Sequence, residues 1–174
     1  IQGLSNYISL SILTGKLSFR ELISLDIIVN YLGYRHTSLL YGELRRRLGL
    51  VYSVSVFNMS FREACLLYII TSTASYKRVV LVITDKVLNL NKFLTKKMVE
   101  EYKKQNINVI KREINDPFKK IDLLKRGWIL YGKIITPEEV IKKMKSVTHK
   151  DIKNIINKYF RSEYLFTTIL EGKD

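Results

Sequence analysis

Apolar and polar residues alternate with a period of two in several short segments, and this spacing predicts β-strands. The first such segment is Ser5–Thr14. Val51–Ser60 alternates in the same way, and Ala64–Thr73 is a more strongly apolar strand. Because only a short loop separates these two, we expect them to pair as an antiparallel hairpin. Tyr164–Leu170 is predicted to be a further strand near the end of the chain.

The remaining apolar residues recur at helical spacing, and polar residues mark where helices begin. Ser18 with Glu21 three residues later forms a capping box, and Asp116-Pro117 places proline at the first helical position. A loop is expected between the first two helices, over Gly33–Thr37. The predicted helices span Phe19–Tyr31, Leu39–Arg47, Tyr76–Leu90, Thr95–Ile114 and Asp116–Tyr131, followed by two short helices that begin at Thr136 and Thr148.

The order of these elements predicts an α+β fold. Strands that are mostly joined by turns or helical pairs favour an antiparallel sheet, and the helices are expected to pack on one face of it. We find no internal repeat and no Pro/Gly-rich linker, so residues 1–174 are predicted to be a single domain. The chain begins at Ile1, which suggests a piece of a longer protein.

The net charge of +14 raises the possibility of a nucleic-acid or anionic-membrane partner. However, the basic residues are scattered over most of the chain instead of forming one cluster. The sequence is also rich in Lys, Ile, Asn and Tyr together, a bias that a low-GC genome produces without selection for charge. A dedicated nucleic-acid site is therefore the lesser alternative.

Other features narrow the class of protein. The lone Cys65 lies in an apolar strand, so we expect a buried thiol and no disulfide framework. No apolar stretch approaches the roughly 20 residues that a membrane-spanning helix needs. Residues Ile1–Thr14 lack a basic leader before their apolar part, which favours an intracellular location.

Three segments in the right order carry a family resemblance. Glu43–Val54 has the sequence E-L-R-R-R-L-G-L-V-Y-S-V, and Ser60–Thr73 is S-F-R-E-A followed by an apolar strand. The third, Leu130–Phe160, contains Y-G-K-I-I-T-P-E-E-V. Together they resemble the second, C-terminal domain of the pitrilysin, insulysin and mitochondrial-processing-peptidase family of zinc metallopeptidases. In that family two similar α+β domains face each other and enclose a peptide.

The resemblance places the zinc site outside this chain. The family's first domain carries an H-x-x-E-H helix, and this sequence has only His36 and His149, neither of which has a second histidine at helical spacing. We therefore assign no catalytic residue and no metal ligand here, and expect the chain to be inactive alone. Zinc is expected in an N-terminal half, which belongs to the same polypeptide or to a separate subunit.

In the family the second domain contributes an arginine and, seven residues later, a tyrosine, which match Arg45 and Tyr52. The resemblance implies that the guanidinium holds a peptide carbonyl or carboxylate and that the phenol donates to the scissile carbonyl. The plainer alternative is that Arg45–Arg47 is a solvated helix face and Tyr52 a packing residue. Family members often have a glycine-rich stretch before the arginine helix, of which only Gly33 remains here, so a substrate role of that loop is in doubt.

Three further side chains have plainer interpretations. Trp128 lies at helical spacing from Leu124 and Tyr131 and is expected to be a core residue. Arg62 and Glu63 are placed in the hairpin loop, with a salt bridge at its rim favoured over a position facing the cleft.

The sequence thus predicts the substrate-gripping, non-catalytic half of a pitrilysin-like zinc metallopeptidase. Its partners would be the zinc-binding half and a peptide, which an edge strand of the sheet would pair with as an extra strand. The alternative is a scaffolding or assembly domain of a catalytically inactive relative.

Overall fold

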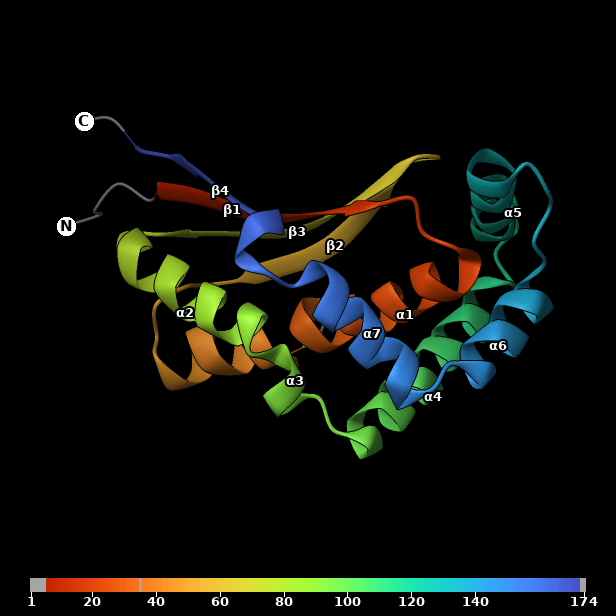
Figure 1. The fold of residues 1–174 in the computed structure, drawn as a ribbon, viewed down its shortest axis with the longest axis horizontal. Coiled ribbons are helices and arrows are strands. Elements are labelled where there is room, and N and C mark those ends of the chain that lie inside the picture. The colour runs from red at the N-terminus through yellow and green to blue at the C-terminus, as the bar shows by residue number, and fades with distance from the viewer. Residues whose placement is uncertain (1–5, 35, 173–174) are drawn as a thin grey trace.

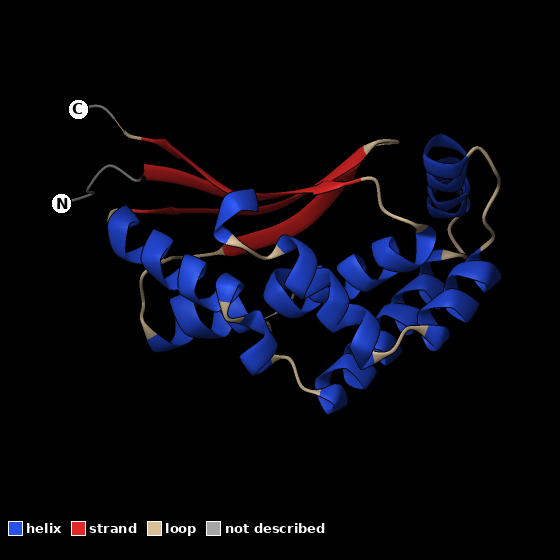
Figure 2. Ribbon diagram, in the orientation of Figure 1, coloured by secondary structure: helices blue, strands red, loops and turns tan. Residues whose placement is uncertain are grey.

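The computed structural model describes residues 6–34 and 36–172. The strands β1 (Asn6–Gly15), β2 (Val54–Ser60), β3 (Ala64–Thr73) and β4 (Leu165–Leu170) form an antiparallel sheet in the order β2-β3-β1-β4. Helices pack beneath one face of this sheet, and no helix of the described residues covers the other (Figures 1 and 2). The predicted α+β class and the β2–β3 hairpin are confirmed.

Alternation along the strands explains which face is covered. Ile8, Leu10 and Ile12 of β1 are buried, and their partners across β3 include the buried Ile69 and Leu67. Since successive side chains of a strand point to opposite faces, these residues all lie on the helix-covered side. This face and the helices below it make the hydrophobic core.

The helices begin where the sequence predicts. Ser18 and Glu21 form both hydrogen bonds of a capping box, and so do Thr136 and Glu139. Asp116 caps the helix that has proline at its first position. The helical segments are α1 (Phe19–Val29), η1 (Asn30–Tyr34), η2 (Tyr41–Arg47), α2 (Tyr76–Leu88), α3 (Leu90–Phe93), α4 (Lys96–Glu113), α5 (Pro117–Tyr131), α6 (Pro137–Ser146), α7 (His149–Tyr159) and η3 (Ser162–Tyr164).

The start of the predicted loop Gly33–Thr37 is wrong, because α1 continues as the π-helical turn η1 through Tyr34, whereas residues 36 and 37 form a turn as predicted. The reason is a close approach to the sheet: a Cβ atom on Gly33 would lie 2.1 Å from Val56 Cγ2 of β2. A residue without a side chain lets the helix pass directly against the strand. Gly33 is therefore a packing residue.

The predicted start of the second strand is also wrong, because residues 51–53 precede β2 and are not part of it. Val51 and Val54 are both buried, a spacing of three that breaks the alternation. Two predicted positions, Ser5 and Arg35, lie outside the described residues.

Candidate functional site

Arg45 lies in the last turn of η2, and Tyr52 lies in the segment that leads to β2. Gly49 stands between them with a φ of +61°, a left-handed conformation that costs a residue with a side chain about 1–2 kcal/mol. The Leu50 N–H donates to the Leu44 carbonyl at 2.9 Å and closes the end of the helix. The chain reverses here and returns Tyr52 to the side of η2.

Two threonines of β3 hold the returning segment. Thr73 Oγ1 donates to the Leu50 carbonyl and Thr71 Oγ1 donates to the Ser53 carbonyl, both at 2.6 Å. These side-chain bonds replace the backbone ladder that a longer β2 would have made. Tyr52 lies between the two anchors, so its backbone position is well defined although it belongs to no strand.

The structure brings the two predicted site residues together. The guanidinium carbon of Arg45 lies 5.1 Å from the centroid of the Tyr52 ring, and its Nη1 is 3.5 Å from the Val51 carbonyl. This is a cation–π contact. Arg45 is exposed and the Tyr52 side chain is 80% exposed. No carboxylate of the described residues pairs with Arg45, so its guanidinium is available to a ligand.

The neighbouring arginine has a different environment. Arg47 forms a two-point ion pair with Glu43 one turn earlier, and Lys86 lies 3.6 Å from the same carboxylate. The hydrogen bond from Arg47 lowers the pKa of Glu43. Glu43 thus pairs with Arg47 and Lys86, and no described ion pair includes Arg45.

This arrangement can bind one polar group of an extended chain. A guanidinium is planar and always charged, and it can direct two N–H donors to a carbonyl or carboxylate. A phenol beside it adds an O–H donor. Both side chains are exposed, and η2, which carries Arg45, lies at the other end of the domain from α5 (Figure 1).

Comparison with known proteins decides the family. Residues 3–106 match the family model described as the Peptidase M16 inactive domain. This chain is an M16 inactive domain. It is 24% identical over 157 residues to an uncharacterized zinc protease of Rickettsia bellii, and the match covers 86% of this chain and 37% of that protease. The domain therefore spans about 37% of the length of this curated relative.

Solved structures show the same fold. The inactive peptidase domain of a zinc protease from Bordetella parapertussis superimposes with a TM-score of 0.84 at 13% identity, covering 99% of this chain and 96% of that one. A protease from Helicobacter pylori has a TM-score of 0.82 at 15% identity, covering 97% of this chain and 41% of its own. The family match confirms the pitrilysin-like resemblance and the zinc-protease family, and the solved structures confirm the fold of this M16 inactive domain.

The histidines of the M16 inactive domain are engaged elsewhere. His36 packs edge-on to Tyr41, with ring centroids 4.7 Å apart, and His149 Nε2 lies 3.0 Å from the Leu94 carbonyl. Over residues 6–34 and 36–172, no three His, Cys, Asp or Glu side chains form a group that could hold a metal ion. The residues present do not fit a zinc site.

Cys65 is buried in β3, as predicted. Its Sγ lies 3.4 Å from Ser60 Oγ, and burial raises the pKa of the thiol. Since the thiolate is the reactive form, this environment does not favour a nucleophile.

The expectation that Trp128 is a core residue is wrong, because its side chain is 61% exposed. Trp128 belongs to an apolar stripe on the outer side of α5, and the inner side of the same helix packs on the domain. We call this surface the α5 outer stripe. It consists of Phe118, Ile121, Trp128 and Ile129, with exposed fractions of 80%, 58%, 61% and 54%.

The sequence favoured a salt bridge at the rim of the hairpin loop, and Glu63 forms one with a residue outside that loop. Glu63 lies 3.6 Å from Lys16 Nζ, and both side chains are exposed. Among the described ion pairs none joins Glu63 to Arg62.

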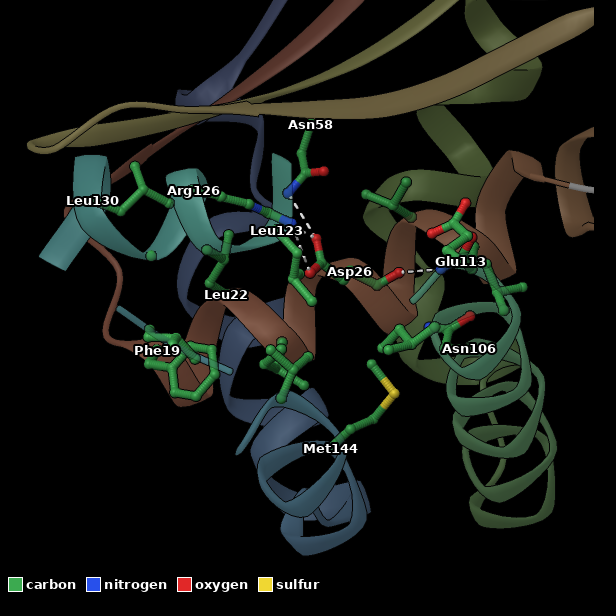
Figure 3. Close-up of a pocket in the computed structure, with 18 of the residues that line it drawn as sticks. Phe19, Leu22, Asp26, Asn58, Asn106, Glu113, Leu123, Arg126, Leu130 and Met144 are labelled. Atoms are coloured by element: carbon green, nitrogen blue, oxygen red, sulfur yellow. Dashed lines mark hydrogen bonds and ion pairs between the residues drawn. The ribbon is translucent and has the colours of Figure 1, made fainter. Parts of the chain in front are cut away.

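Sequence reasoning missed a cavity between α1, α4, α5, α6 and β2 (Figure 3). The signal that could have revealed it is Asp26, an acidic residue among the apolar positions of α1. Its carboxylate accepts hydrogen bonds from Asn58 and Arg126 at the cavity wall.

The sequence predicts no apolar stretch long enough to form a membrane-spanning helix. Within the described part of the chain, no helix combines the length and the apolar character that crossing a bilayer requires.

Proposed function

We propose that this domain is the substrate-gripping, non-catalytic half of a pitrilysin-like zinc peptidase. The observation that supports this most directly is the contact between Arg45 and Tyr52, two exposed side chains that local anchors hold together. A tyrosine that served packing alone would be buried, whereas Tyr52 is 80% exposed.

In this proposal the domain, residues 1–174, is the C-terminal half of a longer or two-subunit enzyme. The zinc and the general base belong to the N-terminal half, and the peptide is held between the two halves. The α5 outer stripe supports an apolar contact with that half, since exposed apolar side chains that gather on one surface often mark an interaction site. A cytoplasmic location stays a prediction.

The roles of the two residues follow from their chemistry. Arg45 would hold a carbonyl or carboxylate of the peptide, in the ground state and in the transition state alike. Tyr52 would donate to the scissile carbonyl as negative charge develops on its oxygen, so its contribution would be greatest in the transition state. β2 is an edge strand that begins two residues after Tyr52, so an extended peptide held at the pair would lie close to an unpaired strand edge.

The test uses the complete, zinc-loaded protease. Arg45→Ala is expected to lower kcat/KM for a peptide substrate by about 10- to 100-fold, the effect of losing a hydrogen bond to a charged group. Tyr52→Phe should lower kcat by about 100-fold with little change in KM, as for loss of an oxyanion donor. Arg46→Ala, one residue along the same exposed helix face, is the matched control and should retain full turnover.

Zinc content and the urea midpoint of each variant distinguish a lost site from a damaged fold. If Arg45→Ala and Tyr52→Phe both retain wild-type turnover, the gripping role is wrong and the scaffolding alternative replaces it. If Arg46→Ala lowers turnover as much as Arg45→Ala does, the loss comes from general surface charge and not from Arg45 in particular.

A further inference from the structure

The cavity at the α5 end of the domain has a volume of about 340 Å³. That is about twice the ~150 Å³ of an engineered apolar cavity that binds benzene. Its wall is mainly apolar and includes Phe19, Leu22, Leu123, Leu130 and Met144 (Figure 3). No residue from Arg45 to Tyr52 lines it, so it is not an extension of that site.

One wall of the cavity is polar, and its carboxylate, Asp26, already pairs with Arg126. The Asp26 carboxylate accepts a hydrogen bond from Asn58 Nδ2 at 3.0 Å and one from Arg126 Nη2 at 3.3 Å. Asp26 raises the pKa of Arg126, so the guanidinium stays charged. These three side chains connect α1, β2 and α5 and hold the cavity open between them.

A second polar group in the wall has no partner. Asn106 of α4 lines the cavity and is only 8% exposed, and its Nδ2 makes no hydrogen bond with any described residue. A buried amide N–H without an acceptor is unfavourable. The Nδ2 atom is itself buried, and because the terminal torsion of asparagine is soft, rotation of the amide can direct this donor to a molecule inside the cavity.

The charges of the lining select against an anion. Asp26 and Glu113 contribute two carboxylates and Arg126 contributes one guanidinium, which leaves a formal charge of −1. An anionic head group would be repelled by this excess of negative charge. A neutral molecule avoids that cost.

We propose that this cavity binds a neutral, apolar small molecule that has one hydrogen-bond acceptor, such as a ketone or amide carbonyl, directed to Asn106. The volume suits about 10 to 15 non-hydrogen atoms, by comparison with the benzene-sized cavity. The apolar body contacts the side chains of α1, α5 and α6, and the carbonyl oxygen accepts from the Asn106 amide. The proposal is independent of the peptidase role, since it uses none of the same residues.

The test is a titration of the chain with probe molecules, followed by NMR of methionine methyl groups. The chain has three methionines, of which Met144 lines the cavity and Met59 and Met98 do not. The probes are 2-nonanone, n-butylbenzene and nonanoate, which match in size and differ in the acceptor and the charge. We expect the Met144 signal alone to shift, with a Kd for 2-nonanone on the order of 0.1 mM for about ten non-hydrogen atoms.

The two uncharged probes isolate the role of Asn106. In the wild type, 2-nonanone is expected to bind about 3- to 10-fold more tightly than n-butylbenzene, the effect of one hydrogen bond. Asn106→Leu should abolish that preference while n-butylbenzene still binds. Asn108→Leu, the same change on the exposed side of the same helix, should leave the preference intact.

Three outcomes overturn the proposal. One is a Met144 signal that none of the probes shifts, and another is a uniform shift of all three methionines, which indicates nonspecific binding. The third is nonanoate binding as tightly as 2-nonanone, which contradicts the charge argument. This last comparison is made on the wild type, so the proposal stays testable even if Asn106→Leu does not fold.

Discussion

Arg20 of α1 and Asp151 of α7 join two helices through side chains 131 positions apart in the sequence. Arg20 Nε and Nη2 lie 3.1 and 3.0 Å from the two carboxylate oxygens, so the pair is bidentate. The same guanidinium donates to the Ser146 carbonyl at 2.6 Å. This hydrogen bonding lowers the pKa of Asp151 from an ordinary 3.8 to about 2.

The lowered pKa makes a pH-dependent contribution to stability. The carboxylate is stabilised by folding, so the contribution is complete above about pH 4 and is lost as the pH falls towards 2. We expect Arg20→Met to lower the free energy of unfolding by about 1 kcal/mol at pH 6, a value reduced for the partial exposure of the pair, and by less at pH 3. Urea unfolding at the two pH values measures this.

The control for this experiment is Arg46→Met, which removes an exposed arginine from the solvent-facing side of η2. The change in the free energy of unfolding that Arg46→Met causes should be the same at pH 6 and pH 3. A pH-independent cost of Arg20→Met would contradict the assignment of the low pKa to this pair.

Individual residues were predictable from sequence where local chemistry decides their environment. Cys65 in an apolar strand is buried, and the capping residues Ser18 and Thr136 form the bonds that their spacing indicates. Trp128 was not predictable, because helical periodicity reports an apolar side and cannot say whether the domain or a partner covers it. The family resemblance singled out Arg45 and Tyr52 as candidates, and only the structure shows them in contact.

At the scale of elements, the π-helical turn η1 depends on one close approach. A Cβ on Gly33 would lie 2.1 Å from Val56 Cγ2 and 3.2 Å from the Val56 amide nitrogen. We expect Gly33→Ala to lower the free energy of unfolding by about 1–3 kcal/mol, the usual cost of overpacking. Chemical denaturation of the variant checks this.

Two further variants test the cause. In Gly33→Ala/Val56→Gly both side-chain clashes, 2.1 Å to Val56 Cγ2 and 2.6 Å to Val56 Cβ, are gone, so the combined loss should be at least about 1 kcal/mol smaller than the sum of the single losses. Gly42→Ala is the control, because its Cβ would meet only the flexible end of Arg46, and it should be neutral or stabilising. Additive losses at Gly33 and Val56 would show that the contact is not the reason for glycine.

The elements were largely predictable from sequence, but their predicted boundaries were wrong where long-range contacts determine them. The predicted strand Val51–Ser60 begins three residues later because two hydroxyls of β3 bind the carbonyls of Leu50 and Ser53. The predicted loop at Gly33 is helical because β2 lies against it. The contact at Gly33 leaves no mark in the local pattern of apolar residues, whereas Val51 and Val54, three positions apart, already break the alternation of the predicted strand.

At the scale of the whole molecule, we expect the exposed apolar residues of the α5 outer stripe to affect association more than the net charge of +14 does. Ile121→Gln/Trp128→Gln in the α5 outer stripe should weaken binding to the zinc-bearing half by about 10-fold or more, because buried tryptophans often dominate interfaces. Association of the two halves, measured by calorimetry, tests this. The urea midpoint should change little, since both side chains are exposed.

Leu81→Gln is the matched control, because Leu81 is also an exposed apolar residue, 71% accessible, but lies on α2. It should leave the association unchanged. An equal weakening in Leu81→Gln would mean that apolar area in general, and not the α5 outer stripe, drives assembly.

The sheet order has a consequence for how the domain folds. β1 is an interior strand, and one of its two neighbours is β4, with Ile8 opposite Ile169. During synthesis one edge of β1 therefore stays unpaired until almost the entire domain has left the ribosome. Closing so long a loop is entropically expensive, which slows the final step of folding. In the finished domain the pairing links one end of the described chain to the other, and Gly172 N–H donates to Asn6 Oδ1 at 3.3 Å.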